Sequence, residues 1–435
     1  MYSVRGILFS KIQKAPVLYS LRQRVPSALF LKHRWVILDQ KNFIETSVDD
    51  AKVPHDASRD VTMTKAVFGR ESSLFVSTGL ARVFRSLCLP VGYPDSSSPN
   101  YSLYVRYNLI QVSLISLTRI LSTQAMLLAV GIGQSGALPM AAVINWLLKD
   151  GLGHLGSILV GTKINTKFDS DPKRYKFLSV FLGQCANLLG IASLSYPSMF
   201  LFFTSLSAAL SRIGTLAVTA SRARIYEDFS LRGNLGDLIR CSQSQSTVAT
   251  LIGTVVGVSL APLIGADITS ILAVFVPASV ATHYMAYKAV SVLQLSTFNM
   301  QRFELVMDSY LSQNGVIPSY HEIAEKERFI LRRSLFKQVL VNPSISLSTV
   351  DSETEGNLRQ YGYHLHQTLD GKVLLFIVEG ASPTQILEGM YNACSRSRGV
   401  HVDSFPRFLA AAHQAGWRTH VAFLDDPLYR LSIVS

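Results

Sequence analysis

Two groups of polar residues interrupt long apolar stretches of the chain, and these are the places where chemistry could occur. The first is the pair Lys149–Asp150, which ends an otherwise uncharged run from Ile120 to Leu148. Charged and amide groups beside apolar helices must find partners, because burying them unpaired is costly. The pair Lys149–Asp150 is therefore either a turn at a membrane surface or a buried polar site. The second group is denser and consists of Arg222, Arg224, Asn234, Asp237, Arg240, Gln243 and Gln245. Arginine binds phosphate and carboxylate groups well, so a structural polar network and a binding site for a small anion both fit this second group.

The glycines that follow Lys149–Asp150 are spaced as in a nucleotide-binding loop. Gly151, Gly153 and Gly156 spell G-x-G-x-x-G. A dinucleotide site needs a strand before this pattern and a helix that begins at it. The preceding AAVINWLLKD is instead typical of a helix, so we interpret the glycines as small residues that let helices pack closely. Gly253 and Gly257 form a G-x-x-x-G pattern with the same expected effect.

Motifs of the common enzyme classes are missing from the sequence. It has no serine elbow, no H-E-x-x-H and no P-loop. Its four cysteines form no C-x-x-C pair, which excludes a metal knuckle and favours a reducing compartment. We therefore expect no catalytic residue, no metal and no cofactor, with an unrecognised enzyme as the alternative.

The composition favours partial embedding in a membrane. Hydrophobic residues make up 48% of the chain, charged residues only 16%, and the mean hydropathy is +0.26; a quarter or so of an average chain is charged. Residues 177–211 carry no charge, and Pro197 is expected to divide them into two helices. Further apolar helices are expected at 104–122, 242–265 and 268–287. A membrane hairpin and a buried helix pair in a large bundle both fit residues 177–211.

Positive charge is concentrated at the N-terminus. The net charge is +12, and residues 1–38 hold seven basic residues and no acidic one. A basic, serine-containing start is typical of a mitochondrial or plastid transit peptide. A disordered basic tail that touches acidic lipid is the alternative. Because basic residues are not clustered with aromatics on folded elements, we expect no nucleic-acid partner.

The last third of the chain has a different pattern. Residues 299–342 are polar, and helices are expected over QRFELVMDSYL and over YHEIAEKERFILRRSLF. Residues 343–357 have the composition of a linker. Within residues 358–435, the alternation around Asp370–Gly371 predicts a β-hairpin, ASPTQILEGMYNAC and SFPRFLAAAHQAGW predict helices, and RTHVAFLDD predicts a third strand. These features indicate a small α+β domain.

The predicted fold is therefore mainly α. An apolar, membrane-associated bundle of several helices occupies residues 101–298, and the small α+β domain follows it. Residues 39–100 are expected to form an irregular lead-in. This lead-in ends in the loop LPVGYPDSSSPNY, whose prolines oppose a helix or a central strand.

Several of these stretches together resemble the root UVB sensitive family. The resemblance extends roughly over residues 85–435, and its motifs are LPVGYPDSSSPNY, LSTQAMLLAVGIG, WLLKDGLGHLGSILVG, FDSDPKRYKF, SRARIYEDFSLRGNLGDLIRCSQSQST, MQRFELVMDSYLSQNGVI, EGASPTQILEGMYNAC and GWRTHVAF. It implies a helical, membrane-associated body and a link to plastid function, early development under ultraviolet-B, auxin transport and pyridoxal phosphate homeostasis. It implies no established enzymatic activity.

Three functions follow as expectations. The first is a non-enzymatic adaptor or scaffold in the membrane of a mitochondrion or plastid, with a protein partner that is a family paralogue or a second copy. The second is a membrane carrier or binding protein for a small phosphorylated anion, using Arg222, Arg240 and Lys149. The third is an unrecognised enzyme.

Overall fold

The chain divides into two compact units, residues 1–81 and residues 82–435, which are described separately. The computed structural model describes residues 20–24, 33–38, 43–46, 85, 87–131, 144, 146–154, 158, 168, 170–313, 315–330, 334–343, 352–400, 404–424 and 430–431. Gly156 and most of the basic segment 1–38 lie outside the described residues.

The first unit contains three short strands. β1 (Ser20–Arg24), β2 (His33–Leu38) and β3 (Phe43–Thr46) form an antiparallel sheet in the order β1-β2-β3. β3 thus places regular structure in a region where the sequence analysis expected an irregular lead-in. The loop predicted at the end of the lead-in is confirmed, because residues 89–100 consist of turns and irregular backbone.

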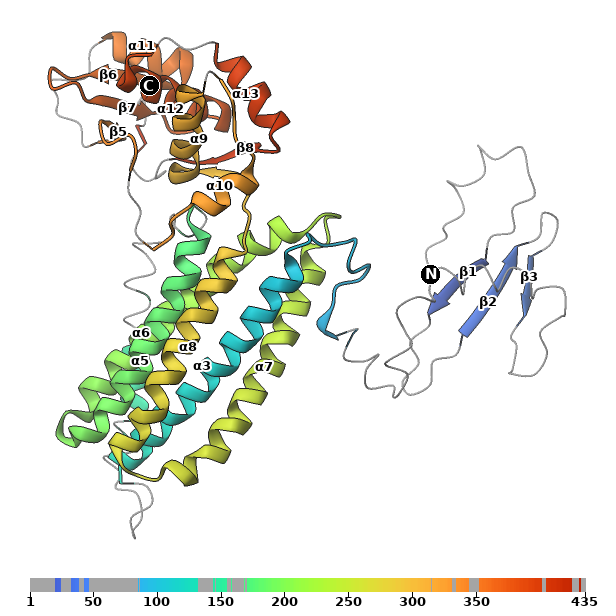
Figure 1. Cartoon of the computed structure of the whole chain (residues 1–435), viewed down its shortest axis with the longest axis vertical. Coiled ribbons are helices and arrows are strands. Elements are labelled where there is room, and N and C mark those ends of the chain that lie inside the picture. The colour runs from blue at the N-terminus through green and yellow to red at the C-terminus, as the bar shows by residue number, and fades with distance from the viewer. Residues whose placement is uncertain are drawn as a thin grey trace. The chain divides into compact units, whose positions relative to one another are not determined.

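Five long helices form the body of the second unit (Figure 1). They are α3 (Tyr101–Ala129), α5 (Pro172–Ser195), α6 (Phe200–Phe229), α7 (Leu235–Ile264) and α8 (Ile268–Ser291). α3 packs against α5, α7 and α8, while α5 also packs against α6 and α8. This architecture confirms the predicted mainly α, apolar bundle. The first helix is longer than expected, since α3 continues past Ser122 to Ala129.

Local sequence explains where these helices begin and end. Pro172 occupies the first turn of α5, where its missing N–H is not needed. Pro197 follows the end of α5 and starts the short 3-10 turn η2 (Pro197–Met199) that leads into α6, so the predicted break is confirmed. Asp267 caps α8, and its carboxylate accepts a hydrogen bond from the Ser270 backbone N–H at 3.0 Å.

Small residues bring α3 and α7 close together. A Cβ atom added at Gly253 would collide with the backbone oxygen of Ser113, and one at Gly257 would lie 2.9 Å from the Cβ of Ile120. Ser116 bridges the same helices, because its Oγ donates to the Thr250 carbonyl at 2.9 Å. The contact therefore combines close backbone approach with side-chain hydrogen bonds to the facing helix.

Gly151 and Gly153 lie in the helical segment 146–154. A Cβ at Gly153 would lie 2.7 Å from the Cβ of Ala208 in α6, whereas one at Gly151 would meet nothing within 4 Å. Helix packing therefore requires a glycine at 153 and not at 151.

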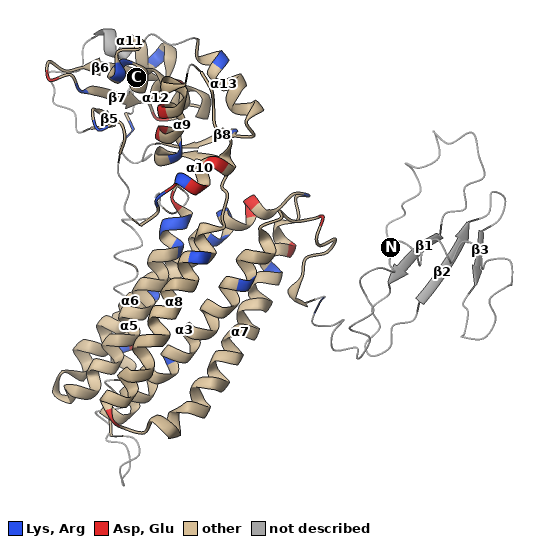
Figure 2. Ribbon diagram, in the orientation of Figure 1, with Lys and Arg blue, Asp and Glu red and all other residues tan. Residues whose placement is uncertain are grey.

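All five long helices have the length and composition of membrane spans. The most apolar stretch of α7 is only 17% buried within the protein, and its exposed apolar side chains include Leu251, Val255 and Val258. Figure 2 shows that charged side chains gather at the end of the bundle next to the α+β region, while most of the helix length carries none. The bundle therefore presents an apolar outer surface, as a protein surrounded by lipid does.

The α+β region follows the bundle. Its elements are β4 (Thr297–Asn299), α9 (Met300–Ser312), α10 (Tyr320–Lys326), β5 (Val339–Val341), α11 (Ser352–Tyr361), β6 (Tyr363–Gln367), β7 (Val373–Ile377), α12 (Pro383–Arg398), α13 (Phe405–Gln414) and β8 (Arg418–Phe423). The predicted hairpin is present as β6 and β7, which pair antiparallel. β5 joins this hairpin parallel to β7, but the predicted third strand, β8, pairs with β4 in a separate two-stranded sheet.

One hydrophobic core joins segments that the sequence analysis had separated as 299–342 and 358–435. Phe303 contacts Phe408 edge-on, and Phe298, the last residue of the predicted bundle segment, stacks on Trp417 with ring centroids 4.5 Å apart. Residues 299–342 alone are close to the lower size limit for a self-contained core, so they bury their apolar side chains against residues 358–435. α11 begins at Ser352, inside the stretch that had the composition of a linker.

The helix expected over YHEIAEKERFILRRSLF is shorter than the pattern suggested. α10 ends at Lys326, and Glu327 has extended backbone dihedral angles. The Glu327 carboxylate contacts Arg302 and Lys173, both of them buried. These ion pairs account for the early end of the helix, because a tertiary contact overrides helix propensity.

Candidate anion-binding cavity in the helical bundle

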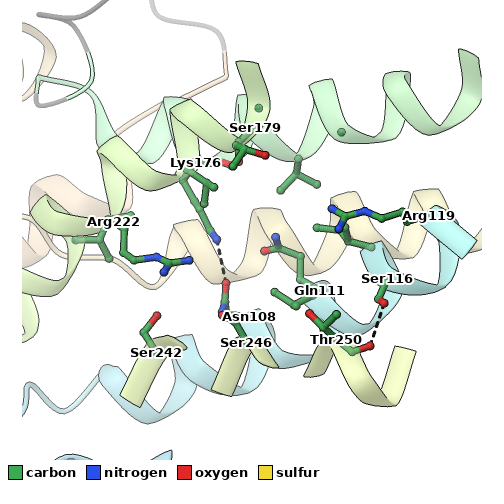
Figure 3. Close-up of a pocket in the computed structure, with 18 of the residues that line it drawn as sticks. Asn108, Gln111, Ser116, Arg119, Lys176, Ser179, Arg222, Ser242, Ser246 and Thr250 are labelled. Atoms are coloured by element: carbon green, nitrogen blue, oxygen red, sulfur yellow. Dashed lines mark hydrogen bonds between the residues drawn. The ribbon is translucent and has the colours of Figure 1, made fainter. Parts of the chain in front are cut away.

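A partly open cavity of about 240 Å³ lies among α3, α5, α6 and α7. Small-molecule pockets usually measure roughly 300–1,000 Å³, so this one suits a small ligand. Figure 3 shows side chains from all four helices converging on it. Its lining is unusual for such apolar helices, because it includes basic, amide and hydroxyl groups.

Three basic side chains line this cavity: Arg119 from α3, Lys176 from α5 and Arg222 from α6. In Figure 3, Arg222 and Arg119 lie on either side of Lys176. The described residues that line the cavity include no aspartate or glutamate. The cavity is therefore electropositive. Lys176 is buried in it, Arg222 is half-buried and Arg119 is exposed, so charge is poorly screened chiefly around Lys176.

Lys176 is the most deeply placed of these cations. The residue is only 7% exposed. Its Nζ donates a hydrogen bond to Oδ1 of Asn108 at 3.0 Å, and no described carboxylate forms an ion pair with it. An amide oxygen stabilises an ammonium group, but it does not neutralise its charge.

Two neighbouring amide side chains shape the cavity: one connects two of its helices, and the other offers an oxygen that can accept a further hydrogen bond. Arg222 Nη1 donates to Oε1 of Gln243 at 3.0 Å, which ties α6 to α7. Gln111 is almost fully buried, and its Oε1 has no hydrogen-bond partner among the described residues. Buried amide oxygens normally have a partner, so this atom is an acceptor that a ligand or water could satisfy.

The structure brings only part of the sequence-predicted polar set to this cavity. Arg222 lines it directly, and Gln243 contacts Arg222. Gln245 is buried beside it on α7, but its amide donates to the Cys88 carbonyl and to the Tyr101 hydroxyl. These bonds tie α7 to the loop before α3.

The remaining predicted residues lie elsewhere in ion pairs and caps. Lys149 Nζ contacts Asp150 at 3.1 Å and lies over the Trp146 ring. The others are Arg224, which pairs with Glu227 at 2.5 Å; Arg240, which pairs with Asp237 at 2.8 Å; and Asn234, which precedes α7 and accepts a hydrogen bond from Ser230. In these surroundings the groups act as structural partners of one another.

Lys176 and Arg119 are the functional candidates that sequence reasoning missed. In the sequence, Arg119 is one of only two charges in the apolar stretch 104–122, and Lys173, Arg174 and Lys176 form a basic run of the kind that usually faces solvent or lipid headgroups. Lys173 and Lys176 are instead buried at 2% and 7% exposure. Lys173 and Lys176 lie three residues apart at the start of α5, and that helix carries no charge after Lys176. This spacing places both lysines on one face of the helix, and it is the sequence signal that could have identified them.

No set of three or more histidine, cysteine, aspartate or glutamate side chains is placed to hold a metal ion within the part of the chain that the structure describes. The described lining of the cavity supplies cationic side chains that can bind an anion, together with one lysine amine.

Residues 76–314 match the family model of the vitamin B6 photo-protection and homoeostasis domain, which covers more than half of the chain. The chain belongs to the root UVB sensitive family. The family match includes every helix that lines the cavity, and it ends before most of the α+β region.

Individual relatives support the same assignment. The chain is 28% identical to RUS family member 1 of Dictyostelium discoideum over 68% of this chain and 56% of that protein. It is 27% identical to protein root UVB sensitive 5 of Arabidopsis thaliana over 68% of this chain and 60% of that protein. It is 30% identical to the Arabidopsis protein root UVB sensitive 2, chloroplastic, over 56% of this chain and 55% of that protein. The chain thus spans a little over half the length of these relatives, and none of these names is that of an enzyme. No solved structure matches the chain.

Proposed function

We propose that this family member is a membrane protein that binds a small phosphorylated anion in the cavity of its helical bundle. The observation that supports this most directly is the convergence of Arg119, Lys176 and Arg222 on one cavity whose described lining has no carboxylate. A buried cation such as Lys176 without a counter-charge is costly, and an anionic ligand would remove that cost. Guanidinium groups also match the geometry of phosphate oxygens.

The family supports a particular class of anion. The matched domain is described by its part in vitamin B6 photo-protection and homoeostasis. The phosphorylated forms of vitamin B6 are small and anionic, and they carry ring hydroxyl and nitrogen groups that amide and hydroxyl side chains can bind. Phosphorylated vitamin B6 is therefore the ligand class we propose, with a binding or carrier role in its homoeostasis.

The proposed location is the membrane of a plastid or mitochondrion. Five helices of suitable length and hydropathy support membrane insertion. The basic, acid-free segment 1–38 and one relative with a chloroplastic name support the organelle. Association with a family paralogue or a second copy remains part of the proposal.

The adaptor or scaffold function that the sequence favoured does not require a cationic cavity. Such a protein would use its surface, and the charges inside the bundle would then have to be neutralised by structural partners. The described residues offer Lys176 an amide and Arg222 a second amide, which satisfy hydrogen bonds but leave both charges uncompensated. This difference is why we place ligand binding first.

Equilibrium binding to the full chain in lipid nanodiscs tests the proposal. The probe is pyridoxine phosphate, an alcohol form that presents the ring and phosphate without a reactive carbonyl. We expect saturable binding, and we expect Arg222→Gln to weaken it by about tenfold or more, or about 1.4 kcal/mol. Arg212→Gln is the matched control, because Arg212 lies on the same helix outside the cavity lining. Absence of saturable binding at millimolar probe, or equal effects of the two variants, would reject a cavity site.

A further inference from the structure

We propose that Lys176 captures aldehyde-bearing phosphate esters covalently, as a reversible imine at its Nζ, while the arginines of the cavity hold the phosphate. This inference rests on the proposed function and adds a chemical step to it. It assigns the aldehyde form of the ligand, and not the alcohol or amine form, as the one that the protein retains.

The surroundings of Lys176 distinguish it from the other lysines near the bundle. Lys173, one turn earlier, forms an ion pair with Glu327 at 2.6 Å. Lys149 contacts Asp150 at 3.1 Å. Lys176 instead points into the cavity, as Figure 3 shows, with Asn108 as its hydrogen-bond partner. It is thus a primary amine that faces a ligand-sized space and is not held in an ion pair with any described carboxylate.

Buried lysines without a carboxylate partner are the type that forms imines with carbonyl compounds. The ammonium of Lys176 and the aldehyde combine to give a protonated imine and one molecule of water. The carbon–nitrogen double bond replaces the carbon–oxygen double bond, the positive charge stays on nitrogen, and nothing is oxidised or reduced. The imine N–H keeps a donor for Oδ1 of Asn108, so the existing hydrogen bond has a counterpart in the product.

The two arginines give this reaction its selectivity. Arg119 and Arg222 line the same cavity from different helices, so a phosphate bound there raises the effective concentration of the aldehyde beside the amine. An aldehyde that lacks a phosphate group should bind more weakly, because it cannot contact the arginines. A phosphate ester that lacks an aldehyde should bind but form no imine. The expected ligand therefore carries both groups on one small molecule.

Borohydride trapping tests the inference directly. Full-length protein in nanodiscs is incubated with pyridoxal phosphate, reduced with sodium borohydride, digested and mapped by mass spectrometry. We expect the reduced pyridoxyl phosphate adduct on the peptide that contains Lys176, at far higher occupancy than on other lysines. Excess inorganic phosphate should reduce that adduct by competing for the arginines.

Two variants separate the covalent step from binding. Lys176→Arg keeps the charge but cannot form an imine, so it should lose the adduct and about tenfold of the affinity for pyridoxal phosphate. Its affinity for pyridoxine phosphate, which has no aldehyde to capture, should fall by clearly less than its affinity for pyridoxal phosphate, and equal losses for the two ligands would overturn the covalent step. Lys288→Arg is the control, because Lys288 contacts Tyr284 in α8 and does not line the cavity.

The outcomes distinguish this inference from the proposed function. Adduct spread evenly over surface lysines, or none at Lys176, overturns the covalent step even if pyridoxine phosphate binds. If the wild-type protein does not bind pyridoxine phosphate at all, the proposed function is rejected instead. The adduct map uses wild-type protein, so it gives an answer even if the Lys176→Arg variant does not fold.

Discussion

Lys173 Nζ lies 2.6 Å from Oε2 of Glu327, and each side chain is only 3% exposed. Arg302 Nε approaches the other oxygen of Glu327 at 2.9 Å. One buried carboxylate thus joins the first turn of α5 to α9 of the α+β region. Asn299 adds a second link, since its amide donates to Asp171 just before α5. The bundle and the α+β region are therefore connected by a polar cluster within one turn of Lys176.

Replacing Glu327 should be strongly destabilising. In Glu327→Gln, the charges of Lys173 and Arg302 stay buried without a counter-charge, which typically costs about 3–5 kcal/mol. The measurement is thermal unfolding of the purified protein in a mild detergent. Glu325→Gln is the matched control, because Glu325 lies two residues earlier, in α10, and is exposed. Similar melting temperatures for the two variants would show that the cluster does not contribute to the stability of the folded protein.

The same cluster predicts a specific dependence of stability on pH. Burial alone would raise the pKa of Glu327, but the charges of Arg302 and Lys173 outweigh it and lower the pKa from 4.5 to about 2. A depressed folded-state pKa contributes stability above the unfolded pKa, and this stability is lost as the pH falls toward the folded value. The contribution should therefore be complete above pH 4.5 and decline between pH 4.5 and 2.

Unfolding measured across this acidic range checks the prediction. The wild type should lose more stability than Glu327→Gln, since the variant has no carboxylate to protonate at this position. Parallel pH curves for the two proteins would contradict the assignment.

Glycine 253 should be required for the contact between α3 and α7. In Gly253→Ala, the added Cβ would collide with the Ser113 carbonyl, and overpacking of this kind costs about 1–3 kcal/mol. Because both helices line the cavity, the affinity for pyridoxine phosphate should fall as well. Gly236→Ala, on the same helix with open space around its Cβ position, serves as the control and should change neither quantity.

The five apolar helices should behave as integral membrane segments. After alkaline carbonate extraction of the membrane fraction, the protein should stay in the membrane pellet, because apolar helices of this length are stable in the bilayer core. As a second readout, Val255→Cys on the exposed face of α7 should resist a membrane-impermeant thiol reagent until detergent is added. Complete release by carbonate would show peripheral attachment and would remove the carrier role.

The sequence predicted the fold class because the signals for it are local. Long uncharged runs, the break at Pro197, the hairpin around Asp370–Gly371 and the helix start at Ser382–Pro383 all depend on neighbouring residues, and the structure has each of them. The pairing of β8 with β4 and the shared core of residues 298–424 were not predicted. Both depend on contacts between segments that are distant in the chain, for which no local pattern exists.

The charged residues of the bundle show the same difference between what the sequence determines and what the tertiary structure decides. Composition alone placed polar groups such as Arg222 within apolar helices and so determined that the bundle must hold or neutralise charge. Only the tertiary structure decided which charges are neutralised. Arg224 and Arg240 each have a carboxylate three residues away on the same helix, whereas Arg119, Lys176 and Arg222 come from three different helices and meet in one cavity. A charge pair within one helix can be read from residue spacing, but a site built across helices depends on how those helices pack, and this is set by the summed contacts of the whole bundle.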